Sequence, residues 1–333
     1  MKTANDILAA ISNLSKKHVL KSAPENYKQG FADAAMFVYP LKDIGKILQD
    51  KFFIPNDSKF DPNKFLESAA ELSVQNHLKH TASVTHFEIE KQVNPPKDVD
   101  AYYEVGAVRI SLEVKCPRER ANDPNALIIK MAGRVPGYED EFNKLRDGIM
   151  EAHPDKDVVL GQNKDNTFKD FLTLSHEKFN PASGIDDCNV LFVACGYHFN
   201  INEWRMHLLQ NEGLFTSQPF YPSVGFELVD VAILSNLKYF HTDAREHHDW
   251  TLRNVFMLPV VNPHARKGMT RESLLKGLSV FEHHLSQFSS FKSLKAGDVP
   301  NHVMDAIKVG VYVEEHLSEA ERLRFFPVKL NKS

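Results

Sequence analysis

Apolar residues recur at helical spacing over the first eighty positions of the chain. Residues 3–22 and 31–53 each carry an apolar stripe, and the turn-prone residues 23–30 separate them. A further helix is predicted over residues 61–80, because Asp61 suits an N-cap and Pro62 suits the first helical position. We therefore expect a helical N-terminal segment, residues 1–60, ahead of the main fold.

Shorter apolar runs follow this helical part and favour strands. After residues 83–93 come two alternating strands at 100–115 and a loop-rich and helical stretch at 116–180. Three runs rich in β-branched residues follow, at 188–197, 227–236 and 254–261. Helical spacing returns at 271–291 and 303–326. This order predicts an α/β fold with a mixed central sheet flanked by helices, formed by residues 61–265 and followed by a helical C-terminal segment, 266–333.

The segment DAYYEVGAVRISLEVK, residues 100–115, reads as a hairpin around a two-residue turn, Gly106-Ala107. Counting from that turn places Val105 opposite Val108 and, at the far end, Asp100 opposite Glu113. One face is then apolar, and the other carries the charged side chains.

Asp100 and Glu113 would repel each other in this register, because directly opposed side chains have Cβ atoms about 5 Å apart. A divalent cation would compensate. Mg²⁺ takes oxygen ligands such as one or two carboxylates, and the carbonyl of Val114 would offer another. Lys115 falls on the same face as Glu113, where it can orient a water molecule and offset negative charge.

These residues resemble the signature of the PD-(D/E)xK nuclease superfamily, which has the restriction-endonuclease-like fold. In that family an Asp on one strand and a (D/E)-x-K on the next hold the metal, so Asp100, Glu113 and Lys115 match the three positions. The family often adds an acid on the preceding helix. Glu71 is our choice for it, and Glu67 stays an alternative.

The sequence departs from the family pattern in the residues that precede Asp100. Val99 stands where the family has proline, and Asp98 would compete as the metal ligand if the turn were different. A second D-x-K, Asp57-Ser58-Lys59, has no strand around it. The other interpretation of the charged residues in the hairpin is a solvated sheet face on which Lys115 neutralises the acids.

The resemblance implies an endonuclease that hydrolyses DNA with Mg²⁺, or with Mn²⁺ as a substitute. RNA stays open as a substrate, and so do restriction, defence, repair and recombination as roles. A homodimer would suit cleavage of both strands. The alternative is a nuclease-like module that binds nucleic acid or assembles with partners without catalysis.

Basic residues after the motif are candidates for phosphate contacts. Arg118 and Arg120 directly follow the second strand, and Lys130 and Arg134 lie further along. A solvated loop explains Arg118 and Arg120 equally well.

The composition adds few constraints on function. The net charge of −4 neither indicates nor excludes a nucleic-acid partner, and the spacing of the three cysteines predicts neither disulfides nor a zinc site. We expect a cytoplasmic protein without a membrane span, since no apolar run approaches about 20 residues.

Histidines offer a third, weaker alternative, a metal hydrolase built on His241, His247 and His248. Together with His283 and His284, they lack a clean ligand spacing, so structural roles are favoured.

Overall fold

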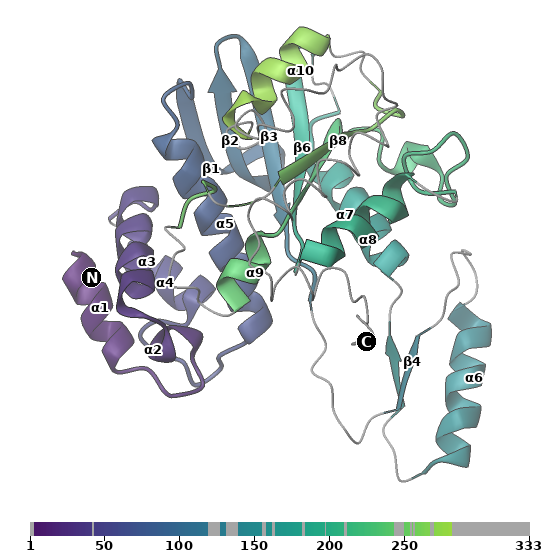
Figure 1. The fold of residues 1–333 in the computed structure, drawn as a ribbon, viewed down its shortest axis with the longest axis horizontal. Helices are drawn as coiled ribbons and strands as arrows, with labels where there is room; N and C mark the ends of the chain where they lie inside the picture. The colour runs from purple at the N-terminus through teal and green to yellow at the C-terminus, as the bar shows by residue number, and fades with distance from the viewer. Residues whose placement is uncertain are drawn as a thin grey trace, which may run out of the picture.

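The fold is seen in a computed structural model of the chain. The structure describes residues 3–41, 43–118, 127–130, 139–154, 158–161, 164–181, 184–196, 198–209, 212–242, 250–253, 255, 257–266 and 270–281. Within these residues a six-stranded mixed sheet has helices on both faces (Figure 1). The expectation of an α/β fold with a mixed central sheet is confirmed.

The large sheet has the strand order β1-β2-β3-β6-β7-β8. Its strands are β1 (His86–Asn94), β2 (Lys97–Val105), β3 (Val108–Lys115), β6 (Asp187–Ala194), β7 (Val231–Ser235) and β8 (Met257–Val261). The first three form an antiparallel meander, β3, β6 and β7 run parallel, and β8 returns antiparallel to β7. The strand β3 therefore lies inside the sheet, paired on both edges.

The helices divide between the two faces of this sheet. On one face lie α1 (Ala4–Ser12), α2 (Val19–Ser22), α3 (Glu25–Val38), α4 (Ile44–Phe52), α5 (Pro62–His80), α9 (Leu237–Thr242) and α10 (Arg271–Leu278). On the other lie α7 (Lys164–Lys178) and α8 (His198–Leu209). Short 3-10 turns occur at Ser223–Gly225 and Ser279–Phe281.

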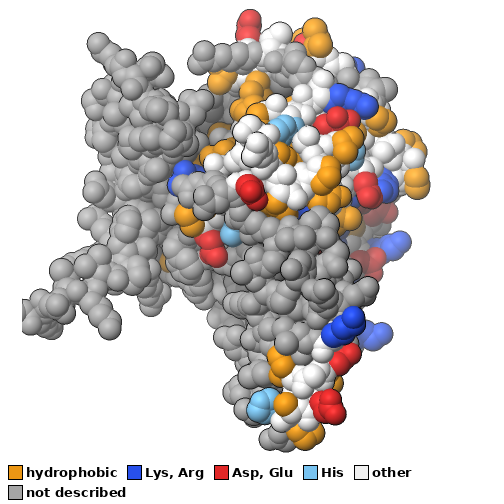
Figure 2. Space-filling model, turned by 90° about the vertical axis from the view of Figure 1, so that its right-hand side faces the viewer, with side chains coloured by type: hydrophobic (Ala, Val, Ile, Leu, Met, Phe, Trp, Pro, Cys, Tyr) orange, Lys and Arg blue, Asp and Glu red, His pale blue; other side chains and the backbone are white. Residues whose placement is uncertain are grey.

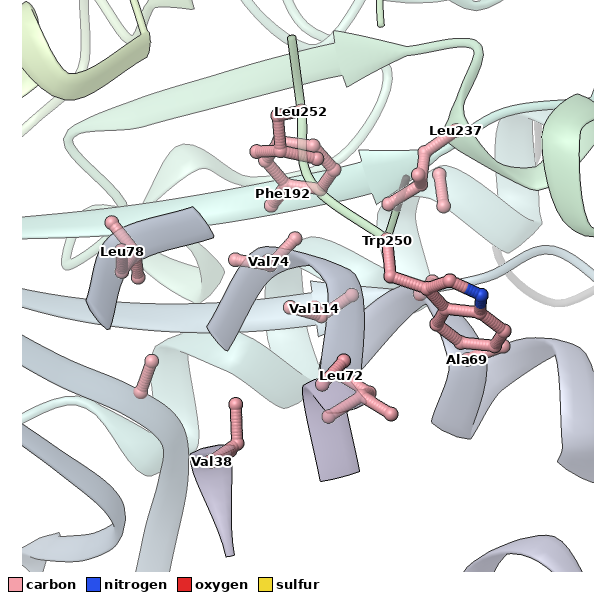
Figure 3. Packing of buried hydrophobic residues seen from close by; sticks show 14 of the residues in the cluster. Val38, Ala69, Leu72, Val74, Leu78, Val114, Phe192, Leu237, Trp250 and Leu252 are labelled. Atoms are coloured by element: carbon pink, nitrogen blue, oxygen red, sulfur yellow. The ribbon is translucent and has the colours of Figure 1, made fainter. Parts of the chain in front are cut away.

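The sheet separates two hydrophobic cores. The larger core packs α5 against the sheet, with Leu72 and Val74 close to Val114 and Phe192, and it also encloses Trp250 (Figure 3). The smaller core joins α7 and α8 to the opposite face. Burial on both faces explains why β6 and β7 read as continuous apolar runs in the sequence.

The predicted hairpin is confirmed where β2 meets β3. Val105 pairs with Val108, and the register continues to Ala101 opposite Leu112, as counted from the sequence. Gly106 has a φ of +61°, which the tight two-residue turn requires and glycine adopts without strain.

Helix α5 also begins as predicted. The Asp61 side chain accepts hydrogen bonds from the backbone N–H groups of Asn63 and Lys64, and Pro62 is the first helical residue. Two expectations were wrong. Residues 25–30 belong to α3 instead of a turn, and the stretch 116–180 contains a small parallel sheet of β4 (Leu127–Lys130) and β5 (Val158–Gly161) beside α6 (Glu139–Ala152).

The C-terminal helical segment is described only in part. Its first expected helix appears as α10, and residues 282–333, which include the helix expected at 303–326, lie outside the described residues. No helix in the described ranges is both long and apolar enough to cross a membrane.

The view in Figure 2 shows positive and negative side chains interspersed with hydrophobic ones on the described part of that face.

Replacing Leu72 by Ala should reduce the free energy of unfolding by about 2–5 kcal/mol, because Leu72 is fully buried in the larger core. Urea unfolding monitored by circular dichroism measures the change. The matched control is Leu174→Ala on α7, where the leucine is 50% exposed and the expected change is within about 0.5 kcal/mol. Equal losses in both variants would contradict the assignment of α5 to the core.

Candidate active site

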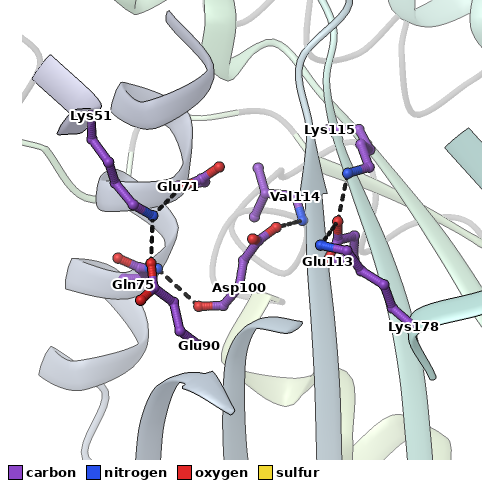
Figure 4. Close-up of polar contacts among 9 residues, drawn as sticks. All are labelled: Lys51, Glu71, Gln75, Glu90, Asp100, Glu113, Val114, Lys115 and Lys178. Carbon is purple, nitrogen blue, oxygen red and sulfur yellow. Dashed lines mark hydrogen bonds and ion pairs between the residues drawn. The ribbon is translucent and has the colours of Figure 1, made fainter. Parts of the chain in front are cut away.

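The strands β2 and β3 stop pairing one residue before the two predicted acids would face each other. The paired register ends at Ala101 and Leu112, so Asp100 and Glu113 do not form the expected backbone pair. Instead, a carboxylate oxygen of Asp100 accepts a hydrogen bond from the backbone N–H of Val114 at 2.7 Å. The Asp100 side chain thus occupies the gap between the two diverging strands (Figure 4).

A break in side-chain alternation explains this position of Asp100. Val99 packs in the smaller core and Ala101 in the larger one, although residues two apart in a regular strand share a face. On the other edge of β2, the pairs of Ile89 with Ala101 and of Lys91 with Val99 flank this level, and Glu90 between them has a φ of +51°. Both irregularities occur at the same level of the sheet, where they turn the Asp100 carboxylate toward β3.

Glu113 is fully buried and faces α7 instead of α5. One of its oxygens, Oε1, lies 2.5 Å from the Nζ atom of Lys115 and 2.7 Å from that of Lys178 at the end of α7. Its other oxygen, Oε2, is buried without a hydrogen-bond partner. This oxygen has the free lone pairs that a cation or a hydrogen-bond donor would need.

The helix acid Glu71 lies on the α5 side of Asp100. Its carboxylate pairs with Lys51 at 2.9 Å, and the same ammonium group binds Glu90 at 2.9 Å. Gln75, one turn further along α5, donates a hydrogen bond to the backbone carbonyl of Asp100 at 2.9 Å. Asp100 therefore lies between the Glu71 group and the Glu113 group (Figure 4).

The pKa values of Asp100 and Glu71 are both raised. Burial, and after it the charge of Glu113, raises the pKa of Asp100 to about 7. Burial, and after it the charge of Asp100, raises the pKa of Glu71 to about 7 despite the pairing with Lys51. Negative charge is thus crowded between α5 and β3, which is the condition that a bound cation relieves.

Lys115 experiences the opposite effect. Burial lowers its pKa, but the charges of Glu113 and Asp100 raise it further, so the net shift is upward. Its ammonium group therefore stays charged and is available to hold an anion or orient a water molecule.

The second helix acid, Glu67, also belongs to this region. Its charge contributes to the raised pKa values of both Lys115 and Glu71, and its carboxylate lies 3.7 Å from a guanidinium nitrogen of Arg118. Arg118 is largely exposed, as expected for a residue at the rim. Glu67 therefore adjoins the lysine end of the site, and Glu71 adjoins Asp100.

The other predicted phosphate contacts fall where side chains are not described. Arg120 and Arg134 lie outside the described residues, and Lys130 ends strand β4.

The oxygen atoms present suit Mg²⁺ better than a metal that needs a full protein ligand set. Among the described residues, no three His, Cys, Asp or Glu side chains form a group that could hold a metal ion. Mg²⁺ commonly uses only one or two carboxylates and takes its remaining ligands from water and substrate. Asp100 and the unpartnered Oε2 of Glu113 fit that requirement, with the Val114 carbonyl as a further candidate.

The alternative of a histidine-based metal site is not supported at His241. His241 is buried in the larger core, where Nδ1 contacts the Tyr27 hydroxyl at 2.8 Å and Nε2 contacts the Ser73 hydroxyl at 3.0 Å. Both ring nitrogens are thus engaged in packing α3 and α5 together. The remaining histidines of that alternative, His247, His248, His283 and His284, lie outside the described residues.

Three charged residues of this region were absent from the sequence interpretation, namely Lys51, Glu90 and Lys178. Each comes from an element other than the motif strands, and none stands at a recognisable spacing from Glu113. Only the packing of α4, β1 and α7 around the meander brings them together.

No protein-family model, no curated protein and no solved structure matches this chain.

Asp100→Asn should stabilise the metal-free protein at pH 8 but leave its stability nearly unchanged at pH 4. Asp100 has a folded-state pKa of about 7 against an ordinary 3.8, so the folded wild type loses stability as pH rises between those values. Asn keeps an acceptor for the Val114 N–H and has no charge to bury. We expect a gain on the order of 2 kcal/mol at pH 8, measured by urea unfolding in EDTA. A difference that is constant from pH 4 to pH 8 would contradict the electrostatic crowding of Asp100.

Proposed function

We propose that the protein is a Mg²⁺-dependent nuclease that hydrolyses DNA phosphodiester bonds, with a restriction-endonuclease-like core. The observation that carries the proposal is the state of Glu113. It is fully buried, one oxygen lies between two lysines, and the other oxygen lacks a partner beside the crowded carboxylate of Asp100. A cation between Asp100 and Glu113 would compensate the negative charge that these two acids bury together.

The arrangement of elements supports the same proposal. An aspartate on β2, an E-x-K on β3 and acids on the preceding helix α5 are what the resemblance implies, and the acids and lysine lie close together in the fold. The observed turn is the one that was counted from the sequence, so the condition under which Asp98 would replace Asp100 is not met. Glu71 fits a role as a direct or water-mediated ligand better than Glu67, because it adjoins Asp100.

In this proposal each residue has a distinct task. Asp100, Glu113 and the Val114 carbonyl would hold Mg²⁺, with Mn²⁺ as a substitute, and Glu71 would assist directly or through water. The bound ion supplies Lewis-acid polarisation of the phosphodiester. Lys115 orients the attacking water and offsets the negative charge that grows on the phosphate during displacement, a task for which its raised pKa keeps it protonated. Arg118 at the rim contacts a neighbouring phosphate.

The alternative function is a nuclease-like module that binds nucleic acid without cleaving it. It would explain the fold and the exposed Arg118 equally well. It gives no reason for burying Asp100 beside Glu113 at the cost of a raised pKa of Asp100, since loss of the Glu113 charge would reduce that cost. We therefore favour the catalytic function.

Asp100→Asn and Glu113→Gln should each reduce cleavage of supercoiled plasmid in Mg²⁺ by roughly 100-fold or more, because each removes an anionic ligand. Gel electrophoresis of nicked and linear products measures the rate, with EDTA and Mn²⁺ in parallel and an RNA substrate alongside.

Asp98→Asn is the matched control, since it makes the same substitution on the same strand, and it should cleave like the wild type. Unchanged cleavage by Asp100→Asn would overturn the site. A wild type that binds DNA but cleaves neither DNA nor RNA in either metal would establish the non-catalytic alternative.

A further inference from the structure

Lys178 reaches the candidate site from outside the motif. It is the last residue of α7, and its Nζ atom lies 2.7 Å from Oε1 of Glu113. The same oxygen also pairs with the ammonium group of Lys115. The charges of Lys178 and Lys115 both lower the pKa of the Asp100 carboxyl, against the larger effects of burial and of Glu113 that raise it. The second lysine thus faces both acids and belongs to the site as much as the motif lysine does (Figure 4).

The placement of Lys178 is fixed by contacts of its neighbour. The Glu177 carboxylate forms an ion pair with Lys97 at 2.6 Å, and the Glu177 backbone carbonyl accepts a hydrogen bond from the Asn94 side chain at 2.9 Å. Both partners belong to the β1–β2 hairpin, the same hairpin that carries Asp100. The end of α7 is therefore held against the strand that supplies the first acid.

The two lysines differ in how freely they can leave Glu113. Lys115 is part of β3, which is paired on both edges, and its side chain is 16% exposed. Lys178 ends a helix, and its side chain is 25% exposed. A cation on the carboxylates would take over part of the charge that Lys178 neutralises, and the long flexible lysine side chain can then turn toward another anion.

We infer that Lys178 is a second substrate-binding lysine of the site, and that its ammonium group contacts a phosphate oxygen of the nucleic acid backbone. The inference rests on the proposed function. In the metal-free protein Lys178 neutralises Glu113 in place of the cation, and in the working complex it neutralises the substrate. The charge of Glu113 would thus be compensated by Lys178 in the metal-free protein and by the cation in the working complex.

The test is the salt dependence of DNA binding, which is read without catalysis. Lys178→Gln keeps a hydrogen-bond donor for Glu113 but removes the charge. Anisotropy of a short fluorescein-labelled duplex in Ca²⁺, over a series of KCl concentrations, gives the slope of log affinity against log salt. Loss of one phosphate contact should reduce the magnitude of that slope by about 1. Cleavage of plasmid in Mg²⁺ should fall roughly 100-fold.

Two further variants separate the role of Lys178 from general effects. Lys178→Arg restores the charge and should restore the slope. Lys169→Gln removes a lysine that pairs with Asp170 elsewhere on the same helix, and it should leave both slope and cleavage unchanged. Thermal unfolding of every variant checks the fold, which the remaining pair of Glu113 with Lys115 should preserve.

The outcomes distinguish this inference from the proposed function. If the wild type cleaves DNA while Lys178→Gln retains both the wild-type slope and the wild-type rate, the inference is overturned and the function stands. A slope that falls equally in Lys169→Gln also overturns it. If the wild type binds without cleaving, the slope alone decides the inference. A wild type that neither binds nor cleaves overturns both.

Discussion

The organisation of this fold around its site depends on burying the carboxylate of Glu113 in the centre of a mixed sheet. A carboxylate in that position is unfavourable unless it is paired, and here two ammonium groups share one of its oxygens. One of these lysines comes from the same strand and the other from α7, so the electrostatic requirement ties the helix to the sheet. The ion pair of Lys178 with Glu113 thus adds a polar contact to the apolar packing of α7 in the smaller core.

The second constraint is the divergence of β2 from β3. Continued pairing would have placed Asp100 beside Glu113 in a regular ladder, where the carboxylates repel. The chain instead ends the ladder at Ala101 and lets the Asp100 side chain bond the Val114 N–H that the missing pair leaves available. The Asp100 side chain thus replaces a backbone hydrogen bond between β2 and β3. Its carboxylate lies between Glu71 of α5 on one side and Lys115 and Lys178 on the other (Figure 4).

Local features of the sequence predicted the motif strands well. The two-residue turn at Gly106 fixes the register by counting, and alternation fixes which side chains enter the larger core. The N-cap at Asp61 fixes the start of α5 and so the position of Glu71. Prediction failed where tertiary packing decides. The face exchange between Val99 and Ala101 breaks the alternation rule, and Lys51 and Lys178 reach the acids from helices whose docking leaves no pattern in the sequence.

Several energetically unfavourable features lie near Asp100. The raised pKa values of Asp100 and Glu71, the left-handed backbone of Glu90 and the unpartnered oxygen of Glu113 all lie within a few residues of one level of the sheet. Positive φ angles and unpartnered buried atoms also occur elsewhere, for example at Phe53 and Ser175, but the two acids with pKa values raised to about 7 are neighbours here. Acids with strongly perturbed pKa values are typical of sites where structure is adapted to binding a ligand rather than to stability. Because the unfavourable term is excess negative charge, the ligand that would relieve it is a cation.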